Sequence, residues 1–366
     1  MTTPGLPPLR RPSAMPARKK TTTLLKLAVT AVLLWLLYRK VDFDAFAKIF
    51  ANADGRWIPA YFAIAFLNMY LSSLRWRLFL RADGIEVPVR QLFASHWIAS
   101  FCNFFLPSTV GGDVYRVADV GAKSGSVARG GASVFMDRLC GFLAMSFLGF
   151  LFPLAGLRHV PRERWPWLLV PVAFFVAFAA VFVLFVRGQG LLRRLVRLAP
   201  APVRGRIEGF TGKFLDSVAA GAARPAVVAR AVAISLVFQM FVFTAIAVTG
   251  RVLRFPVPFA WYCVFAPLVC ILEALPVSIN GMGLREAAYA AFFGIAFPLV
   301  GFEPPEGLDG PTFARTCAGA MALCYMALTL AYALGGGFLL LLRMYAPRRG
   351  GRRPVPAGET AAGDKQ

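Results

Sequence analysis

Two short segments of this sequence place acidic and basic residues beside glycine and proline within long apolar stretches. They read FFLPSTVGGDVYR at residues 104–116 and EALPVSINGMGLRE at residues 273–286. If these stretches lie in a bilayer, each central charge costs about 2.5 to 3.5 kcal/mol. Its retention indicates either a functional site or a buried salt-bridge network that holds the broken helices together, and for the whole set a functional site is favoured. We expect a substrate-binding site formed by Asn103, Gly111, Gly112, Asp113, Arg116, Asp137, Arg138, Glu273, Ser278, Asn280, Gly281, Gly283, Arg285 and Glu286.

The two segments repeat one pattern, which suits the binding of an anion. In each, a Leu-Pro pair is followed by a hydroxyl residue, a glycine and an arginine at the second, fifth and ninth positions after the proline. Helices that restart at Val114 and Leu284 would direct their N–H groups and positive dipole ends at the bound group. Arg116 and Arg285 would add planar guanidinium groups suited to phosphate. We therefore predict a midplane cavity for an anionic headgroup, in which Arg116 pairs with Asp137 and the arginines are oriented by Asp113, Asp137, Glu273 and Glu286.

The elements that would position these residues are apolar helices. The chain has 366 residues and is 58% hydrophobic, against roughly 45 to 50% in globular proteins, and its mean hydropathy is +0.63. Shorter apolar runs stop at Pro107 and Pro276, which predicts two re-entrant, broken-helix hairpins that form an inverted repeat. Runs near the ~20 residues that cross a bilayer predict about six full spans, at residues 24–38, 57–80, 130–155, 166–186, 227–248 and 312–344. The spans and the two hairpins together predict an all-α polytopic membrane protein.

The positive charges of the chain indicate its orientation. Lysine and arginine number 40 against 18 acidic residues, a formal charge of +22, and they gather at the two ends of the chain and in a central loop at 187–224. Because basic segments stay on the cytoplasmic side, both termini are expected in the cytoplasm and the protein in a bacterial cytoplasmic membrane. Residues 1–20 and 347–366 are expected to be disordered basic tails of a transmembrane domain at 21–346.

Other kinds of chemistry are not expected from these residues. The six cysteines lie in apolar runs without a CxxC spacing, so they predict no metal site. No GxxxxGK[ST] segment is present, and we expect neither ATP nor another cofactor. Nucleic acid is not an expected partner, because no helix-turn-helix or Lys/Arg-aromatic module is present. His96 is expected to anchor its helix near the membrane surface, and residues 41–50 to form a short interfacial helix.

Three motifs follow one another along the chain: FFLPSTVGGDVYR, MDRLCG and LPVSINGMGLREAA. In this order they resemble the flippase-like, lysylphosphatidylglycerol synthase transmembrane family, over about residues 24–344. The resemblance implies a membrane domain that moves lipids or lipid-linked molecules between leaflets. Some relatives add a cytoplasmic aminoacyltransferase domain and others are associated with hopanoids. The added domain is not expected here, since the chain ends about twenty residues after its last expected span. The matching residues are Asn103, Leu106, Pro107, Gly111, Gly112, Asp113 and Arg116; Asp137, Arg138 and Gly141; and Pro276, Ser278, Gly281, Gly283, Arg285 and Glu286.

The expected function is therefore that of a lipid translocase, not an enzyme, whose partners are membrane lipids, above all anionic ones. Two alternatives stay open. One is a scaffold that supports lipid-biosynthetic partner proteins through its basic loops. The other is a membrane transferase acting on a lipid-linked substrate, which the short loops and the near absence of histidine disfavour.

Overall fold

The elements that the structure describes are all helices. The computed structural model describes residues 35, 42–105, 111–156, 169–188, 190–191, 194, 201–274 and 283–345, and no strand occurs among them. The prediction of an all-α fold is confirmed. The helices are α2 (Phe43–Ala51), the 3-10 turn η1 (Gly55–Trp57), α3 (Ile58–Ala82), α4 (Val89–Phe105), α5 (Gly111–Ser124), α6 (Val127–Gly156), α7 (Leu169–Arg187), α9 (Ala201–Ala222), α10 (Pro225–Val252), α11 (Phe259–Ala274), α12 (Leu284–Leu299) and α13 (Gly310–Tyr345).

Within the described residues, four helices are long and apolar enough to cross a membrane: α3 with η1, α6, α10 and α13. They correspond to four of the six predicted spans and make the chain a multi-pass membrane protein. The predicted span at 166–186 corresponds to α7, which has 19 residues. The predicted span at 24–38, apart from Trp35, and the predicted tails at 1–20 and 347–366 lie outside the described residues.

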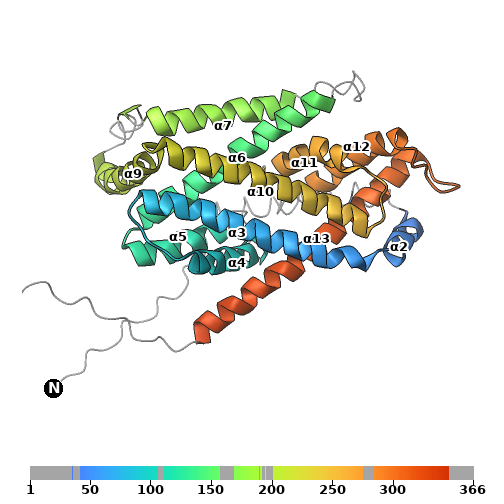
Figure 1. Ribbon diagram of the computed structural model, residues 1–366, viewed down its shortest axis with the longest axis horizontal. Helices are drawn as coiled ribbons and strands as arrows, with labels where there is room; N and C mark the ends of the chain where they lie inside the picture. The colour runs from blue at the N-terminus through green and yellow to red at the C-terminus, as the bar shows by residue number, and fades with distance from the viewer. Residues whose placement is uncertain are drawn as a thin grey trace, which may run out of the picture.

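Two groups of helices, α3 to α6 and α10 to α13, run in opposite directions. In Figure 1, α3 runs from the end of the molecule that carries α2 to the end that carries α9, and α10 packs beside it in the reverse direction. The hairpin of α4 and α5 lies near the α9 end, whereas the hairpin of α11 and α12 lies near the α2 end. We call α3 to α6 the first repeat and α10 to α13 the second repeat. Their reversed directions are those of an inverted repeat.

The turns that join α3 to α4 and α10 to α11 share one geometry, which extends the repeat beyond the two hairpins. The N–H groups of Ile85 and Phe255 each donate to the carbonyl five residues earlier, at 2.8 and 2.9 Å. The preceding residues, Gly84 and Arg254, have positive φ angles of 72° and 59°. Each turn is therefore a Schellman motif, which a left-handed residue closes.

These two left-handed positions predict opposite effects of substitution. A left-handed conformation costs ~1–2 kcal/mol for a residue with a Cβ atom and little for glycine. A Cβ on Gly84 would meet no atom within 4 Å, so Gly84→Ala is expected to lower the free energy of unfolding by about 1 kcal/mol. Arg254→Gly is expected to raise it by a similar amount. Thermal unfolding in detergent measures both, and changes of the same sign would contradict the shared geometry.

Carboxylates cap the helices at the α2 end. The predicted interfacial helix at 41–50 is α2, and Asp42 accepts a hydrogen bond from the N–H of Ala45 at 2.8 Å. The N–H of Asp42 in turn donates to Thr316 Oγ1 at 3.2 Å, which attaches α2 to α13. Asp309 accepts from the N–H of Thr312 at the start of α13. Hydrogen bonding to the side chain of Thr312, and then to its backbone N–H, lowers the pKa of the Asp309 carboxyl.

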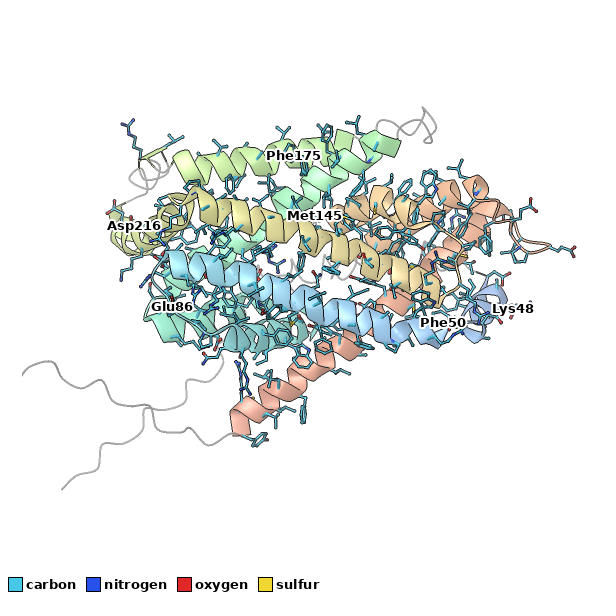
Figure 2. The ribbon with its side chains drawn as sticks, in the orientation of Figure 1. Lys48, Phe50, Glu86, Met145, Phe175 and Asp216 are labelled. Atoms are coloured by element: carbon cyan, nitrogen blue, oxygen red, sulfur yellow. The ribbon has the colours of Figure 1, made fainter. Side chains whose placement is uncertain are left out.

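Charged side chains mark the two ends of the molecule. Figure 2 shows Lys48 at the α2 end and Glu86 and Asp216 at the α9 end. Between them, Met145 on α6 lies inside the bundle and is 5% exposed. Phe175 lies between the ends as well, on α7 at the outer side of the bundle. The apolar middle is the part that a bilayer would surround.

The central basic loop predicted at 187–224 is, in the part that the structure describes, largely the helix α9. This segment forms a helix because it carries an apolar stripe, which the many basic residues of the segment obscured in the sequence. Leu215 and Val218 lie three residues apart on one helical face and are 2% and 0% exposed. Val218 packs in a cluster with Phe79 of α3 and Met136 of α6. The stripe therefore attaches α9 to the first repeat.

A run of three glycines lets α13 approach α4 closely. A Cβ atom on Gly336 would overlap the carbonyl oxygen of Trp97 and lie 2.6 Å from its carbonyl carbon. A Cβ on Gly337 would lie 2.6 Å from the ring of Phe101. The indole of Trp97 donates to the carbonyl of Tyr332 at 2.8 Å. This contact follows the rule that small residues allow helix backbones to meet within membranes.

Candidate functional site

Asp137 lies at the centre of a buried charge cluster. Its Oδ1 atom accepts from Arg75 Nε at 2.6 Å, and its Oδ2 atom accepts from Arg116 Nη2 at 2.8 Å. Asp137 is 1% exposed and both arginines are 4% exposed. The three side chains come from α6, α3 and α5. The predicted pairing of Arg116 with Asp137 is confirmed.

Asp113 extends this cluster towards its exposed edge. It accepts from Arg116 Nη1 at 3.3 Å and from Arg138 Nε at 2.8 Å. The side chain of Arg138 is 42% exposed, so it forms the accessible edge of the cluster. We call Arg75, Asp113, Arg116, Asp137 and Arg138 the arginine cluster. Its three cations and two anions leave one positive charge in surplus.

Uncharged side chains hold the arginines in place. The guanidinium of Arg116 lies over the ring of Trp76, 4.2 Å from the ring centroid, in a cation–π contact. The indole of Trp76 donates to Ser133 Oγ at 3.0 Å, which fixes the ring. Arg75 Nη1 donates to Ser235 Oγ of α10 at 3.0 Å. Arg116 Nε is buried and has no hydrogen-bond partner among the described residues. Within the described part of the chain, it is therefore a donor without an acceptor.

The contacts of two residues at the cluster were not expected from the sequence. Arg75, which was not among the expected site residues, lies within α3, seven residues and so roughly 10 Å before its last residue Ala82. The reason is Asp137, which supplies an anion at that depth. His96, expected near the membrane surface, is 9% exposed, and its Nε2 atom is hydrogen-bonded with Ser72 Oγ at 3.1 Å. The contacts of Arg75 with Asp137 and of His96 with Ser72 leave no signal in the sequence, because in each pair the two residues lie on different helices.

The first hairpin is closed by a side chain and two glycines. Asn103 Oδ1 accepts from the N–H of Gly112 at 2.6 Å. Gly111 and Gly112 are buried, and a Cβ on Gly112 would overlap the carbonyl oxygen of Ala99. Helix α5 therefore begins at Gly111, three residues before the predicted restart at Val114. The glycines allow α5 to begin in direct contact with α4, and Asn103 lies at its N-terminus.

The second hairpin carries a charge cluster of the opposite sign. Arg285 Nη2 lies 3.4 Å from Glu286 Oε1, and Arg285 Nε lies 3.6 Å from Glu273 Oε1. Glu286 Oε2 also accepts from the N–H of Gly283 at 2.5 Å, at the start of α12. Gly283 has a φ of 86°, which favours glycine there. We call Glu273, Arg285 and Glu286 the glutamate cluster. Its one cation and two anions leave one negative charge in surplus.

Helix α12 begins at Leu284, as predicted, so the arginine and the glutamate that follow lie in its first turn. The other predicted residues of this segment, Ser278, Asn280 and Gly281, lie outside the described residues, and so do Pro107 and Pro276. The structure thus describes one charge cluster that includes residues of each hairpin.

The sequence of residues 23–308 matches the family of the lysylphosphatidylglycerol synthase TM region. The match covers well over half of the 366-residue chain and contains both charge clusters. The chain belongs to this family. No curated protein matches it. In this member of the lysylphosphatidylglycerol synthase TM family, the matched region ends just before α13, which begins at Gly310.

Proposed function

We propose that this protein moves an anionic lipid, or an anionic lipid-linked molecule, between the leaflets of a bacterial cytoplasmic membrane. The surplus positive charge of the arginine cluster is the observation that carries the proposal. An uncompensated charge inside a membrane protein is costly. A phosphate that carries one negative charge would supply the missing counter-ion.

Arg116 and Arg138 would bind the headgroup. Asp113 accepts one hydrogen bond from each, which orients both guanidinium groups. Arg116 Nε, which has no partner among the described residues, and the exposed part of Arg138 would then donate to phosphate oxygens. The acyl chains would stay in the surrounding lipid while the headgroup crosses.

The two hairpins would be re-entrant and would line the path of the headgroup, with both termini of the chain in the cytoplasm. Non-helical backbone at membrane depth is tolerated where protein or water satisfies its polar groups. Hairpins that enter from opposite faces would meet near the midplane, where inverted-repeat transporters place their sites. Arg285 is a weaker headgroup ligand than its sequence motif indicates, because two carboxylates already surround it.

Lipid movement in reconstituted vesicles tests the proposal. Fluorescent phosphatidylglycerol is incorporated, and an impermeant quencher reports the rate at which it changes leaflet. The double variant Arg116→Gln/Arg138→Gln is expected to reduce this rate about tenfold or more. The reason is that each charge-assisted hydrogen bond contributes ~1.5–3 kcal/mol and about 1.4 kcal/mol corresponds to a factor of ten.

Arg81→Gln is the matched control. Arg81 also forms an ion pair, with Glu86 at 3.2 Å, but its side chain is 49% exposed and it lies outside the cluster. The rate at which Arg81→Gln moves the fluorescent lipid between leaflets is expected to equal that of the wild type. An unchanged rate in the folded double variant would contradict the headgroup role. If cells that express the double variant also had the same phenotype as cells that express the wild type, the scaffold alternative would be favoured.

A further inference from the structure

The glutamate cluster contains two carboxylates that are not equivalent. Glu286 accepts from the N–H of Gly283 and from Arg285, at the positive end of the α12 dipole, so its charge is compensated. Glu273 Oε1 is buried and has no hydrogen-bond partner among the described residues. Arg285 Nε is buried and without such a partner too, at 3.6 Å from that oxygen. The surplus negative charge therefore belongs to Glu273.

The surroundings of Glu273 offer neutral hydroxyl groups rather than a second cation. Its electrostatic neighbours are the Arg285 and Glu286 side chains of its own cluster, Cys270 on α11 itself, Tyr61 of α3, Tyr289 of α12 and Tyr325 of α13. Tyr289 is 1% exposed, and its hydroxyl has no partner within the described part of the chain. The neighbouring helices α6, α7 and α10 add no charged side chain near Glu273 among the described residues.

A proton suits this place better than a metal ion. Metal ions such as Ca²⁺ take six to eight oxygen ligands, and no group of three His, Cys, Asp or Glu side chains that could hold a metal occurs in the described residues. A proton on Glu273 removes the surplus charge and converts the carboxylate into a hydrogen-bond donor.

We propose that Glu273 binds a proton that crosses the membrane together with the anionic headgroup; this inference rests on the proposed function. An O–H bond forms at Glu273 with a proton from water on one side and breaks when the proton leaves to water on the other. The headgroup neutralises the arginine cluster, and the proton neutralises the glutamate cluster. One monoanionic headgroup and one proton carry no net charge, so a pH gradient drives the movement and a membrane potential does not.

Vesicles containing fluorescent phosphatidylglycerol test this coupling. A pH gradient of one unit is expected to shift the steady-state ratio of the probe between leaflets by up to about tenfold, as one-to-one coupling requires. A potassium diffusion potential at equal pH is expected to leave the ratio unchanged. A wild-type protein that moves the probe without responding to the pH gradient, or that responds to the potential, would overturn the inference.

Glu273→Gln assigns the proton to its residue. In this variant, the pH gradient is expected to leave the ratio of the probe between leaflets the same as the ratio that the variant shows without a gradient. Glu306→Gln, the same change in an exposed loop, is expected to keep the response. Retention of the response by folded Glu273→Gln would refute the assignment.

Infrared spectroscopy of the purified protein gives a readout that does not need transport. The carbonyl band of a buried, protonated carboxylic acid is expected to titrate with pH in the wild type and in Glu306→Gln, and to be missing in Glu273→Gln. Its persistence in Glu273→Gln overturns the assignment even if that variant moves no lipid. A wild type that moves no lipid contradicts the proposed function, whereas the band still decides whether Glu273 carries the proton.

Discussion

Replacement of Asp137 by asparagine is expected to lower the free energy of unfolding by about 3 to 5 kcal/mol, the usual effect of removing one partner from a buried ion pair. Asp137 accepts from both Arg75 and Arg116, and all three are nearly fully buried. The variant leaves one carboxylate, that of Asp113, for three arginines. The expected result is a lower unfolding temperature in detergent and less monodisperse protein in size-exclusion chromatography.

Two further variants separate this charge effect from a general effect of the substitution. Glu86→Gln removes the acid of an exposed ion pair with Arg81 and is expected to cost at most about 1 kcal/mol. Arg75→Met added to Asp137→Asn returns the cluster to a surplus of one positive charge, so part of the stability should return. If Asp137→Asn were no more harmful than Glu86→Gln, the carboxylate would not be needed to compensate the arginines.

Replacement of Gly336 by leucine is expected to separate α13 from α4 and to cost about 3 kcal/mol or more. The new side chain meets the backbone of Trp97, which no change of rotamer can relieve. Leucine would otherwise favour the helix over glycine by about 0.5 to 1 kcal/mol, so the expected loss is due to the contact alone. Thermal unfolding in detergent measures it.

Gly294→Leu provides the matched control. Gly294 lies within α12, and a Cβ atom there would meet nothing within 4 Å. This variant is expected to be as stable as the wild type or slightly more stable. Equal losses from Gly294→Leu and Gly336→Leu would show that the close approach of α13 to α4 is not what limits stability.

The hairpins and their charged residues could be predicted from the sequence because membrane burial makes charges and broken apolar runs conspicuous. The cost of a lone charge in lipid required Asp137 to pair with a cation such as Arg116, as it does. The same reasoning located the first turn of α12, since Gly283 precedes it directly.

Other parts of the site depended on contacts that no local pattern encodes. Arg75 precedes Arg77 and Arg81 in one basic run, and only the contact with Asp137 on α6 distinguishes it. Asn103 could not be recognised as the residue that closes the first hairpin, because its partner Gly112 lies nine residues away across the break between two helices. Basic residues likewise obscured the apolar stripe of α9, which requires α6 as a packing surface.

The hydrogen bond from Arg75 to Ser235 joins residues of different repeats. A second bond across the same boundary runs from Gln239 Nε2 of α10 to the carbonyl of Gly141 on α6, at 3.2 Å. A rotation of α10 relative to α3 and α6 would strain both of these bonds. The position of the Arg75 side chain, and through Asp137 that of Arg116, is thus mechanically linked to the angle between the repeats.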